Sequence, residues 1–153
     1  MRWNRLEDEA CSVARTVSVI GDRWTLLILR DCFLRVRRFE EFQARLGITR
    51  PLLASRLRKL VKDFVLAKVP YQQRPLRYEY RLTEKGLALY PLIIALLEWG
   101  NTYAVSAEGP LVELTHRDCG ALVQLEVRCA EGHQVASARD VTPVPGPGAR
   151  MIA

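Results

Sequence analysis

The sequence of 153 residues lacks any long apolar run. Its longest candidate, residues 92–97, is far shorter than the roughly 20 apolar residues that a membrane-spanning helix needs. Residues 1–9 are rich in charge and lack the apolar segment of a signal peptide. We therefore expect a cytoplasmic protein that does not bind membranes.

The sequence also lacks the signatures of common enzymes. It contains no glycine-rich phosphate loop, no dinucleotide fingerprint and no Ser-His-Asp set. Ser55 and Ser106 have no candidate base near them in sequence, and the whole chain has only two histidines. These absences predict that the chain is not an enzyme.

Cysteine is scarce, with four in the chain. In a cytoplasmic setting thiols stay reduced, so these residues are metal ligands, reactive thiols or small core residues before they are disulfides. The 49% of hydrophobic residues is ample for a packed core. The length predicts one domain of about 100 residues with an appendage.

Positive charge is concentrated in one stretch. The chain carries a net charge of +6, and residues 50–81 contain nine basic residues against two acids. Residues 105–153 are instead weakly acidic, with four basic residues against six acids. This distribution is typical of a surface for phosphate. The alternative is a solvated basic face without a partner.

Residues 49–63 predict a helix that begins with a cap at Thr49 and tolerates Pro51 in its first turn. Leu53, Leu57 and Leu60 recur at helical spacing and form an apolar stripe. A preceding helix over residues 39–46 ends at Gly47, and the two helices predict a helix-turn-helix. Two earlier helices are expected over residues 11–20, ended by Gly21, and residues 23–33, capped by Asp22.

Residues 69–82 alternate between apolar and polar residues on either side of a tip near Pro75, which predicts a hairpin. Thr83 then caps a long helix that reaches residue 103, and Pro91 is expected to kink or split it. A basic helix followed by a basic hairpin is the layout of a winged helix-turn-helix. The sequence therefore predicts binding to double-stranded DNA.

The candidate DNA-binding residues have basic or hydroxyl side chains that suit guanine edges and phosphates. Arg38 could equally form an ion pair with Glu41. The candidates lie on the predicted helix, at the hairpin tip or just before residue 39: Arg37, Arg38, Thr49, Arg50, Ser55, Arg56, Lys59, Arg74 and Arg77.

The last helix, with Leu87, Tyr90, Ile94 and Leu97, is apolar over much of its circumference. It either packs on its own domain or, as we prefer, meets the N-terminal helix of a second copy in a homodimer. Two-fold symmetry suits DNA, because paired recognition helices about 34 Å apart contact half-sites one turn apart.

Beyond residue 104 the composition changes. Short strands are expected at residues 111–114 and 122–127. His116, Cys119, Cys129 and His133 supply four ligands on two turns, which suits a structural Zn²⁺. The alternative is a small hairpin with both cysteines packed inside and both histidines exposed. Residues 143–153, rich in proline and glycine, predict a disordered end.

Four segments together resemble the HxlR-type bacterial transcriptional regulators, relatives of the MarR winged-helix proteins: residues 11–14 (CSVA), 20–30 (IGDRWTLLILR), 38–42 (RFEEF) and 78–86 (YEYRLTEKG). The resemblance implies a dimeric regulator, often a repressor, that places the 49–63 helix in the major groove and uses the hairpin as the wing. It also implies that Cys11 occupies a position that senses oxidants or electrophiles in some members. The alternative prediction is that Cys11 is a small residue buried at the dimer interface.

These patterns predict a mainly α fold with a small β component. Residues 1–104 form a winged helix-turn-helix and dimerisation domain, residues 105–142 a β-rich tail that resembles the zinc-ribbon-like extensions of some HxlR-type proteins, and residues 143–153 the end. The predicted function is sequence-specific DNA-binding regulation, as a homodimeric repressor of a dyad-symmetric operator with an unknown small-molecule effector. The alternatives are redox sensing through Cys11 and a protein-interaction adaptor on a winged-helix scaffold.

Overall fold

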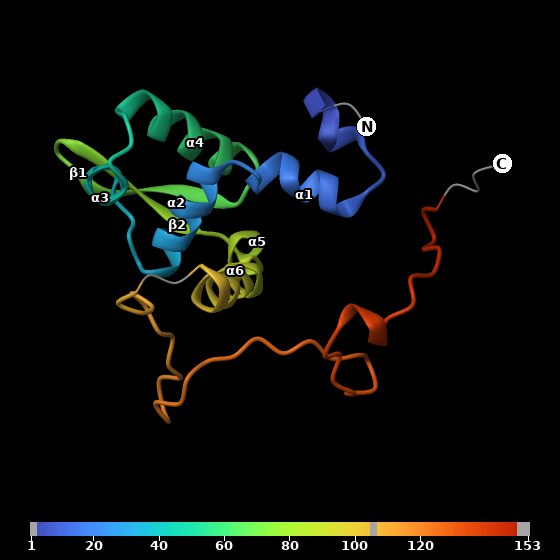
Figure 1. Ribbon diagram of the computed structural model, residues 1–153. Helices are drawn as coiled ribbons and strands as arrows, with labels where there is room; N and C mark the ends of the chain where they lie inside the picture. The colour runs from blue at the N-terminus through green and yellow to red at the C-terminus, as the bar shows by residue number, and fades with distance from the viewer. Residues whose placement is uncertain (1–2, 105–106, 150–153) are drawn as a thin grey trace. The chain divides into compact units, whose positions relative to one another are not determined.

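The computed structural model describes residues 3–104 and 107–149, and Figure 1 shows its helices and strands. The chain divides into two units, the first ending at Ile93 and the second beginning at Ile94. The division falls within one helix, and the domain boundary that the sequence predicts at residue 104 stays a prediction. Within the described ranges, no helix is both long and apolar enough to cross a membrane.

The first unit is built on short helices whose ends match the predicted caps and stops. Asp22 caps one of them through its side chain, and Gly47, with φ of 60°, ends another. The cap position Thr49 is confirmed, but its side chain makes no cap hydrogen bond. The helices are η1 (Trp3–Asp8), α1 (Ser12–Ile20), α2 (Arg23–Phe33), α3 (Phe39–Leu46) and α4 (Arg50–Lys62).

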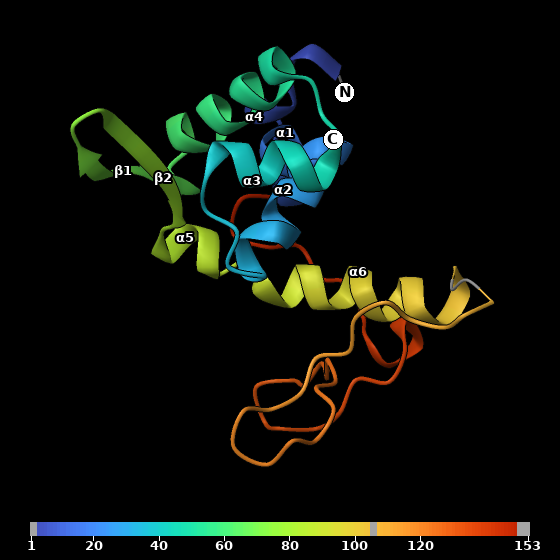
Figure 2. The same cartoon turned by 90° about the vertical axis from the view of Figure 1, so that its left-hand side faces the viewer.

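A two-stranded antiparallel sheet forms the wing, which extends from the helices in Figure 2. Strand β1 (Leu66–Gln73) pairs with β2 (Leu76–Leu82), with an irregularity between Pro70 and Gln72. The wing is anchored at its base, because the N–H of Tyr80 donates to the Arg37 carbonyl at 2.8 Å. The sheet starts three residues before the predicted residue 69.

The hydrophobic core joins α2, α3, α4 and the start of β1. The predicted stripe of α4 is confirmed, since Leu53, Leu57 and Leu60 are fully buried. In α2, Ile28 is buried, while Trp24, Leu27 and Phe33 are half-buried. The most deeply buried residues there are Thr25, Ile28, Leu29 and Asp31.

The predicted final helix is split, as Pro91 indicated. Thr83 accepts a hydrogen bond from the N–H of Gly86 at 3.1 Å and so caps α5 (Glu84–Leu87). Helix α6 (Tyr90–Tyr103) then begins with Pro91 in its first turn, where the missing N–H costs nothing. Gly86 is needed because a Cβ there would collide with the carbonyl oxygen of Val65.

The predicted strands at residues 111–114 and 122–127 are wrong. The described part of the tail, residues 107–149, contains only the isolated bridges Thr115↔Leu122 and Arg128↔Gln134 and the short helix η2 (Ala138–Asp140). None of its residues is buried, so the alternating apolar side chains have no face to pack against and no further strand to join. Residues 143–149 contain no helix or strand, while residues 150–153 lie outside the described part.

One ion pair joins α4 to the start of α2. Asp22 caps α2 by accepting from the N–H groups of Trp24 and Thr25, and it also accepts two hydrogen bonds from Arg56, at 2.8 and 3.2 Å. Partial burial would raise the pKa of Asp22. The hydrogen bonds from Arg56 and from the two N–H groups, with the Arg56 charge, outweigh burial and lower the pKa below its ordinary value of 3.8.

This pair predicts a pH-dependent loss of stability in Asp22→Asn. Asparagine keeps the cap but not the charge, so we expect the free energy of unfolding at pH 7 to fall by about 0.5–1 kcal/mol. A lowered folded pKa contributes stability above the unfolded pKa that is lost as pH falls through the folded value. The difference between wild type and variant, measured by urea denaturation, should therefore begin to shrink as the pH falls to about 3.8 and should vanish only below the lowered folded pKa.

The control is a double-mutant cycle with Arg56→Gln. A loss of the same size in Asp22→Asn when Arg56 is already replaced, or a difference that persists at low pH, would contradict the ion pair.

Candidate nucleic-acid interface

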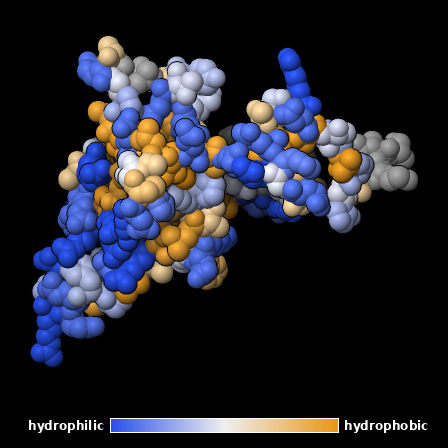
Figure 3. All heavy atoms as spheres, turned by 90° about the horizontal axis from the view of Figure 1, so that it is seen from below, coloured by the Kyte–Doolittle hydropathy of each residue, from blue (hydrophilic) through white to orange (hydrophobic). Residues whose placement is uncertain are grey.

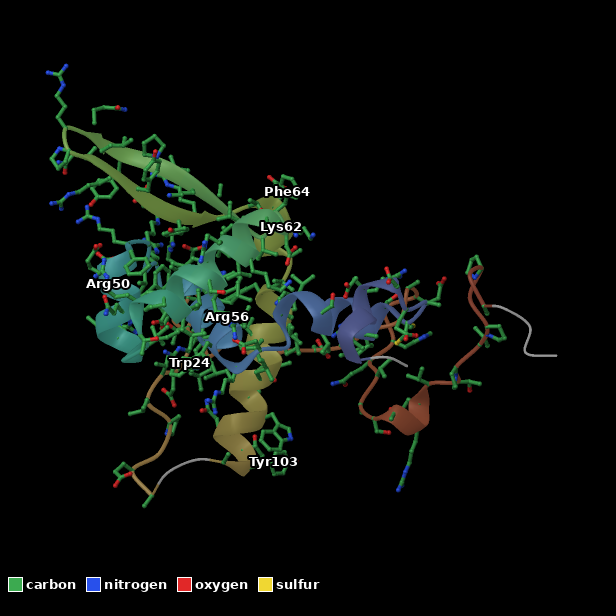
Figure 4. All side chains as sticks on the ribbon, turned by 90° about the horizontal axis from the view of Figure 1, so that it is seen from above. Trp24, Arg50, Arg56, Lys62, Phe64 and Tyr103 are labelled. Atoms are coloured by element: carbon green, nitrogen blue, oxygen red, sulfur yellow. The ribbon has the colours of Figure 1, made fainter. Side chains whose placement is uncertain are left out.

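Helix α4 presents one face to solvent because the opposite face is buried. Pro51, Arg58 and Lys62 are exposed, with the half-buried Ser55 between them, at spacings of three and four residues. Thr49 is exposed at the helix start, where its hydroxyl is not used as a cap. Figure 4 shows Arg50 at one end of α4 and Lys62 at the other.

Two of the predicted basic residues are held by neighbours. Arg50 donates to the side-chain oxygen of Gln43 at 3.0 Å, and its guanidinium carbon lies 4.9 Å from the centre of the Phe39 ring. Lys59 donates to Asp63, the C-cap residue of α4, at 2.7 Å. Both side chains stay exposed, so each keeps donors for a further partner.

Arg56 lies in a different environment from the one the sequence suggested. Its side chain is 28% exposed and makes the ion pair with Asp22. In Figure 4 it lies near the middle of α4, toward Trp24 of α2. This partner is 34 residues away in sequence, and no local pattern could have revealed it.

The sequence did not single out two exposed basic residues of α4. Arg58 makes one hydrogen bond, from its Nε to the carbonyl oxygen of Ala54 at 3.2 Å. Neither Arg58 nor Lys62 forms an ion pair within the described part of the chain. Their spacing from Pro51, opposite the leucine stripe, was the signal that could have found them.

The far end of the wing is cationic. Arg74 and Arg77 are exposed and have no acidic partner among residues 3–104 and 107–149. The one acid of the hairpin, Glu79, lies near the base, where it is nearly buried and accepts from Arg81 at 2.6 Å. In Figures 1 and 4 the wing tip and the start of α4 lie toward the same side.

Arg37 and Arg38 lie at the base of the wing. The carboxylate of Glu41 accepts from the backbone N–H of Arg38 at 3.0 Å and of Arg37 at 3.2 Å. The Arg38 N–H is the main cause of a lowered pKa of Glu41. The guanidinium of Arg38 stacks 4.5 Å from the centre of the Tyr71 ring. Both arginine side chains are exposed beside the hairpin.

The four cysteines lie in different environments. Cys32 is buried, and burial raises the pKa of its thiol to about 12, which fits a small core residue. Cys11 is exposed in the single chain. Cys119 and Cys129 are also exposed, so the alternative in which both are packed inside a hairpin is wrong.

The four predicted metal ligands form two pairs. The Sγ of Cys119 lies 3.4 Å from Nδ1 of His116, and the Sγ of Cys129 lies 3.5 Å from Nδ1 of His133. Within the described residues, no three His, Cys, Asp or Glu side chains converge closely enough to hold a metal ion. The structure thus brings the ligands together two by two.

A cavity of about 280 Å³ lies in the first unit, between the end of α2 and the base of the wing. Its lining combines apolar side chains with three arginines: Cys32, Phe33, Arg35, Arg37, Tyr80, Arg81, Leu82 and Leu87.

Several known proteins are similar to this chain in sequence and in fold. An uncharacterised HTH-type transcriptional regulator of Mycobacterium tuberculosis, Rv3095, is 46% identical over 145 residues, which cover 95% of this chain and 90% of the relative. The crystal structure of PA1607, a candidate transcription factor, matches with a TM-score of 0.83 and 40% identity, over 92% of this chain and 98% of that chain. The reduced form of the redox regulator HypR matches with a TM-score of 0.57 and 32% identity, over 61% and 94%.

The family model described as HxlR-like helix-turn-helix matches residues 19–108, which span α2, the helix-turn-helix, the wing and α6. This match and the relatives confirm the family that the sequence indicated, and the family consists of regulators rather than enzymes. The chain belongs to the HxlR family of DNA-binding helix-turn-helix transcriptional regulators, with a MarR-like winged-helix fold.

Proposed function

We propose that this regulator is a homodimeric repressor that binds a dyad-symmetric operator, with α4 in the major groove and the wing on the minor groove. One observation carries the proposal: the exposed Arg58 and Lys62 on α4 and Arg74 and Arg77 at the wing tip have no acidic partners within the described residues. Such charges release counterions when they meet phosphates. We also propose a cytoplasmic location, because a bacterial regulator of transcription acts on the chromosome, which lies in the cytoplasm.

The start of α4 supports direct contact with a groove. The first N–H groups of a helix favour an anion, and Thr49 and Arg50 lie beside them. Ser55 and Arg58 follow on the exposed stripe, where a serine can contact bases or phosphates and an arginine can contact guanine with two hydrogen bonds. We propose Arg58 and Lys62 as additions to the contact set, with Lys59 on a phosphate.

Arg56 has a separate role in this proposal. Its ion pair with Asp22 fixes the rotation of α4 on α2, so Arg56 positions the helix and its remaining donors contact the duplex only secondarily. Arg74 and Arg77 hold the minor groove or its phosphates from the wing. Arg37 and Arg38 contact phosphates beside the base of the wing.

Exposed apolar side chains support the homodimer. On α1, Val13 is 70% exposed, and on α6, Trp99 is 62% exposed. Figure 3 shows hydrophobic residues grouped on the face seen from below. Apolar patches of this kind mark interaction surfaces. The exposed apolar residues of α6 are Tyr90, Leu92, Leu96, Trp99 and Tyr103.

The dimer predicts a change of mass in solution for Trp99→Glu. A buried charge at the interface should convert a dimer of 17.4 kDa chains into monomers, measured by light scattering after size-exclusion chromatography. The matched control is Leu111→Glu, because Leu111 is 98% exposed in the tail and should leave the mass unchanged. A wild-type protein that is monomeric at all concentrations would rule out the dimer.

DNA contact predicts a graded response to loss of charge. Duplexes selected from a random pool by the full chain should share a dyad-symmetric consensus. On that consensus, Arg58→Ala should weaken binding about tenfold or more. Arg74→Ala should lower the salt dependence of the binding constant by about one unit of slope per monomer. Fluorescence anisotropy across a salt series measures both quantities.

The control for these variants is Arg139→Ala, which removes an exposed tail arginine and should change neither quantity. Arg56→Gln should lower stability while leaving the salt slope nearly unchanged. A chain with little duplex affinity even at low salt would instead support the alternative, a protein-interaction adaptor on a winged-helix scaffold.

A second candidate function is redox regulation through Cys11. Cys11 is exposed at the N-cap of α1, and a solvent-accessible thiol can be oxidised. The similar protein HypR is named a redox regulator, with structures of its oxidised and reduced forms. The alternative is that Cys11 is buried in the interface of the proposed dimer and has no redox role.

Redox regulation predicts that mild oxidation weakens DNA binding of the wild type but not of Cys11→Ser. The comparison should be made in a chain that also carries Cys119→Ser and Cys129→Ser, because those thiols are exposed as well. Binding that responds equally with and without Cys11 would remove this function.

A small-molecule effector stays a prediction. The arginine-lined cavity includes Arg37 and Tyr80, whose backbone hydrogen bond anchors the wing, so an anion bound there could alter the wing's position. A thermal-shift screen of aromatic carboxylates against wild type and Arg81→Ala would test it, and equal shifts in both would exclude the cavity.

A further inference from the structure

The arginines of α4 differ in what holds their guanidinium groups. The Nε and Nη2 atoms of a guanidinium carry two parallel N–H donors on one edge, which suits two acceptors in one plane. Arg56 donates from both of these atoms to the carboxylate of Asp22, at 2.8 and 3.2 Å. Arg58 donates from its Nε to the carbonyl oxygen of Ala54 at 3.2 Å. Neither arginine therefore has the whole edge available for a ligand.

Arg50 keeps this edge available. It donates from Nη1, on the other side of the guanidinium, to the side-chain oxygen of Gln43 at 3.0 Å. Within residues 3–104 and 107–149, its Nε and Nη2 make no hydrogen bond and its charge has no acidic partner. The side chain is exposed, so the two parallel donors are accessible at the start of α4, where Figure 4 labels Arg50.

Two neutral side chains of α3 hold the guanidinium of Arg50. The ring of Phe39 packs against the hydrophobic core, and its centre lies 4.9 Å from the guanidinium carbon. Gln43 lies one turn further along the same face of α3. Its backbone carbonyl accepts from the N–H of Gly47 at 3.0 Å, in the turn that leads to α4. Gln43 thus contacts both the turn and the arginine that follows it.

The neutrality of these two supports preserves the charge of Arg50. A carboxylate in the place of Gln43 would neutralise the guanidinium and occupy its donors, as Asp22 does for Arg56. An amide oxygen and an aromatic ring restrict the guanidinium without cancelling its charge. An arginine that is already oriented loses less conformational entropy when it binds. The start of α4 therefore presents a pre-organised, positively charged pair of donors.

We propose that Arg50 is the residue that recognises guanine in the operator, with Gln43 and Phe39 as its positioning residues. Guanine presents O6 and N7 as two acceptors at its major-groove edge, and an arginine bonded to both is the commonest specific contact. In helix-turn-helix proteins the first residues of the second helix contact base edges, and Arg50 is the first residue of α4. The inference rests on the proposed binding of DNA and adds which base is recognised.

The test is selection of duplexes from a random pool by the full wild-type chain and by Arg50→Ala. The wild-type consensus should contain a guanine in each half-site whose preference Arg50→Ala loses, while the other positions keep theirs. On two duplexes that differ only at this base pair, the wild type should discriminate about tenfold or more and the variant hardly at all. Fluorescence anisotropy measures both binding constants.

Gln43→Met tests the positioning role, because methionine is of similar size and lacks the amide acceptor. No charge changes, so the salt dependence of binding should stay the same, while discrimination at the guanine should fall about two- to tenfold. In a chain that already carries Arg50→Ala, Gln43→Met should have no further effect on that discrimination. The matched control is Gln124→Met, which replaces an exposed glutamine of the tail and should change neither quantity.

The possible failures are distinguishable. A wild type that selects no consensus would remove the proposed function and this inference with it. A wild type that selects a consensus, with an Arg50→Ala variant that keeps every base preference and binds all duplexes equally more weakly, would overturn this inference alone and make Arg50 a phosphate contact. A loss of discrimination in Gln43→Met that is equally large without Arg50 would show that Gln43 contacts the base itself and would overturn its positioning role.

Discussion

The structure depends on the burial of the leucine stripe of α4 against α2 and α3. Leu53, Leu57 and Leu60 have no exposed surface, so they fix which face of the helix is left to solvent. The helical period then places Arg58 and Lys62 on the opposite face. The ion pair between Asp22 and Arg56 adds a polar constraint on the same rotation. Core packing therefore decides which cations a duplex can reach.

The placement of acids completes this surface. Asp31 is fully buried between Arg30, at 2.8 Å, and Arg45, at 3.2 Å. Glu79 pairs with Arg81 at the base of the wing, and Asp22 pairs with Arg56. These three acids are paired away from the start of α4 and the wing tip, so Arg58, Lys62, Arg74 and Arg77 keep unneutralised charge. The net charge of +6 is modest, but the positive electrostatic potential is concentrated at α4 and the wing tip.

Local signals predicted most of the fold, because caps and stops act over a few residues. Asp22, Gly47, Thr83 and Pro91 each marked a helix end correctly. Long-range contacts were not predictable in the same way: the partner of Arg56 is 34 residues away, and it changes the residue's role. The tail strands failed because alternation alone does not make a sheet without a buried face.

The central claim is that α4 and the wing form one surface for a duplex. Amide hydrogen exchange of the full chain, with and without a selected operator, tests it most directly. The account predicts slowed exchange confined to residues 49–62 and the wing, with α6 unchanged because its proposed interface is already formed in the free dimer. Slowed exchange in the tail or α1, with none in α4, would contradict it.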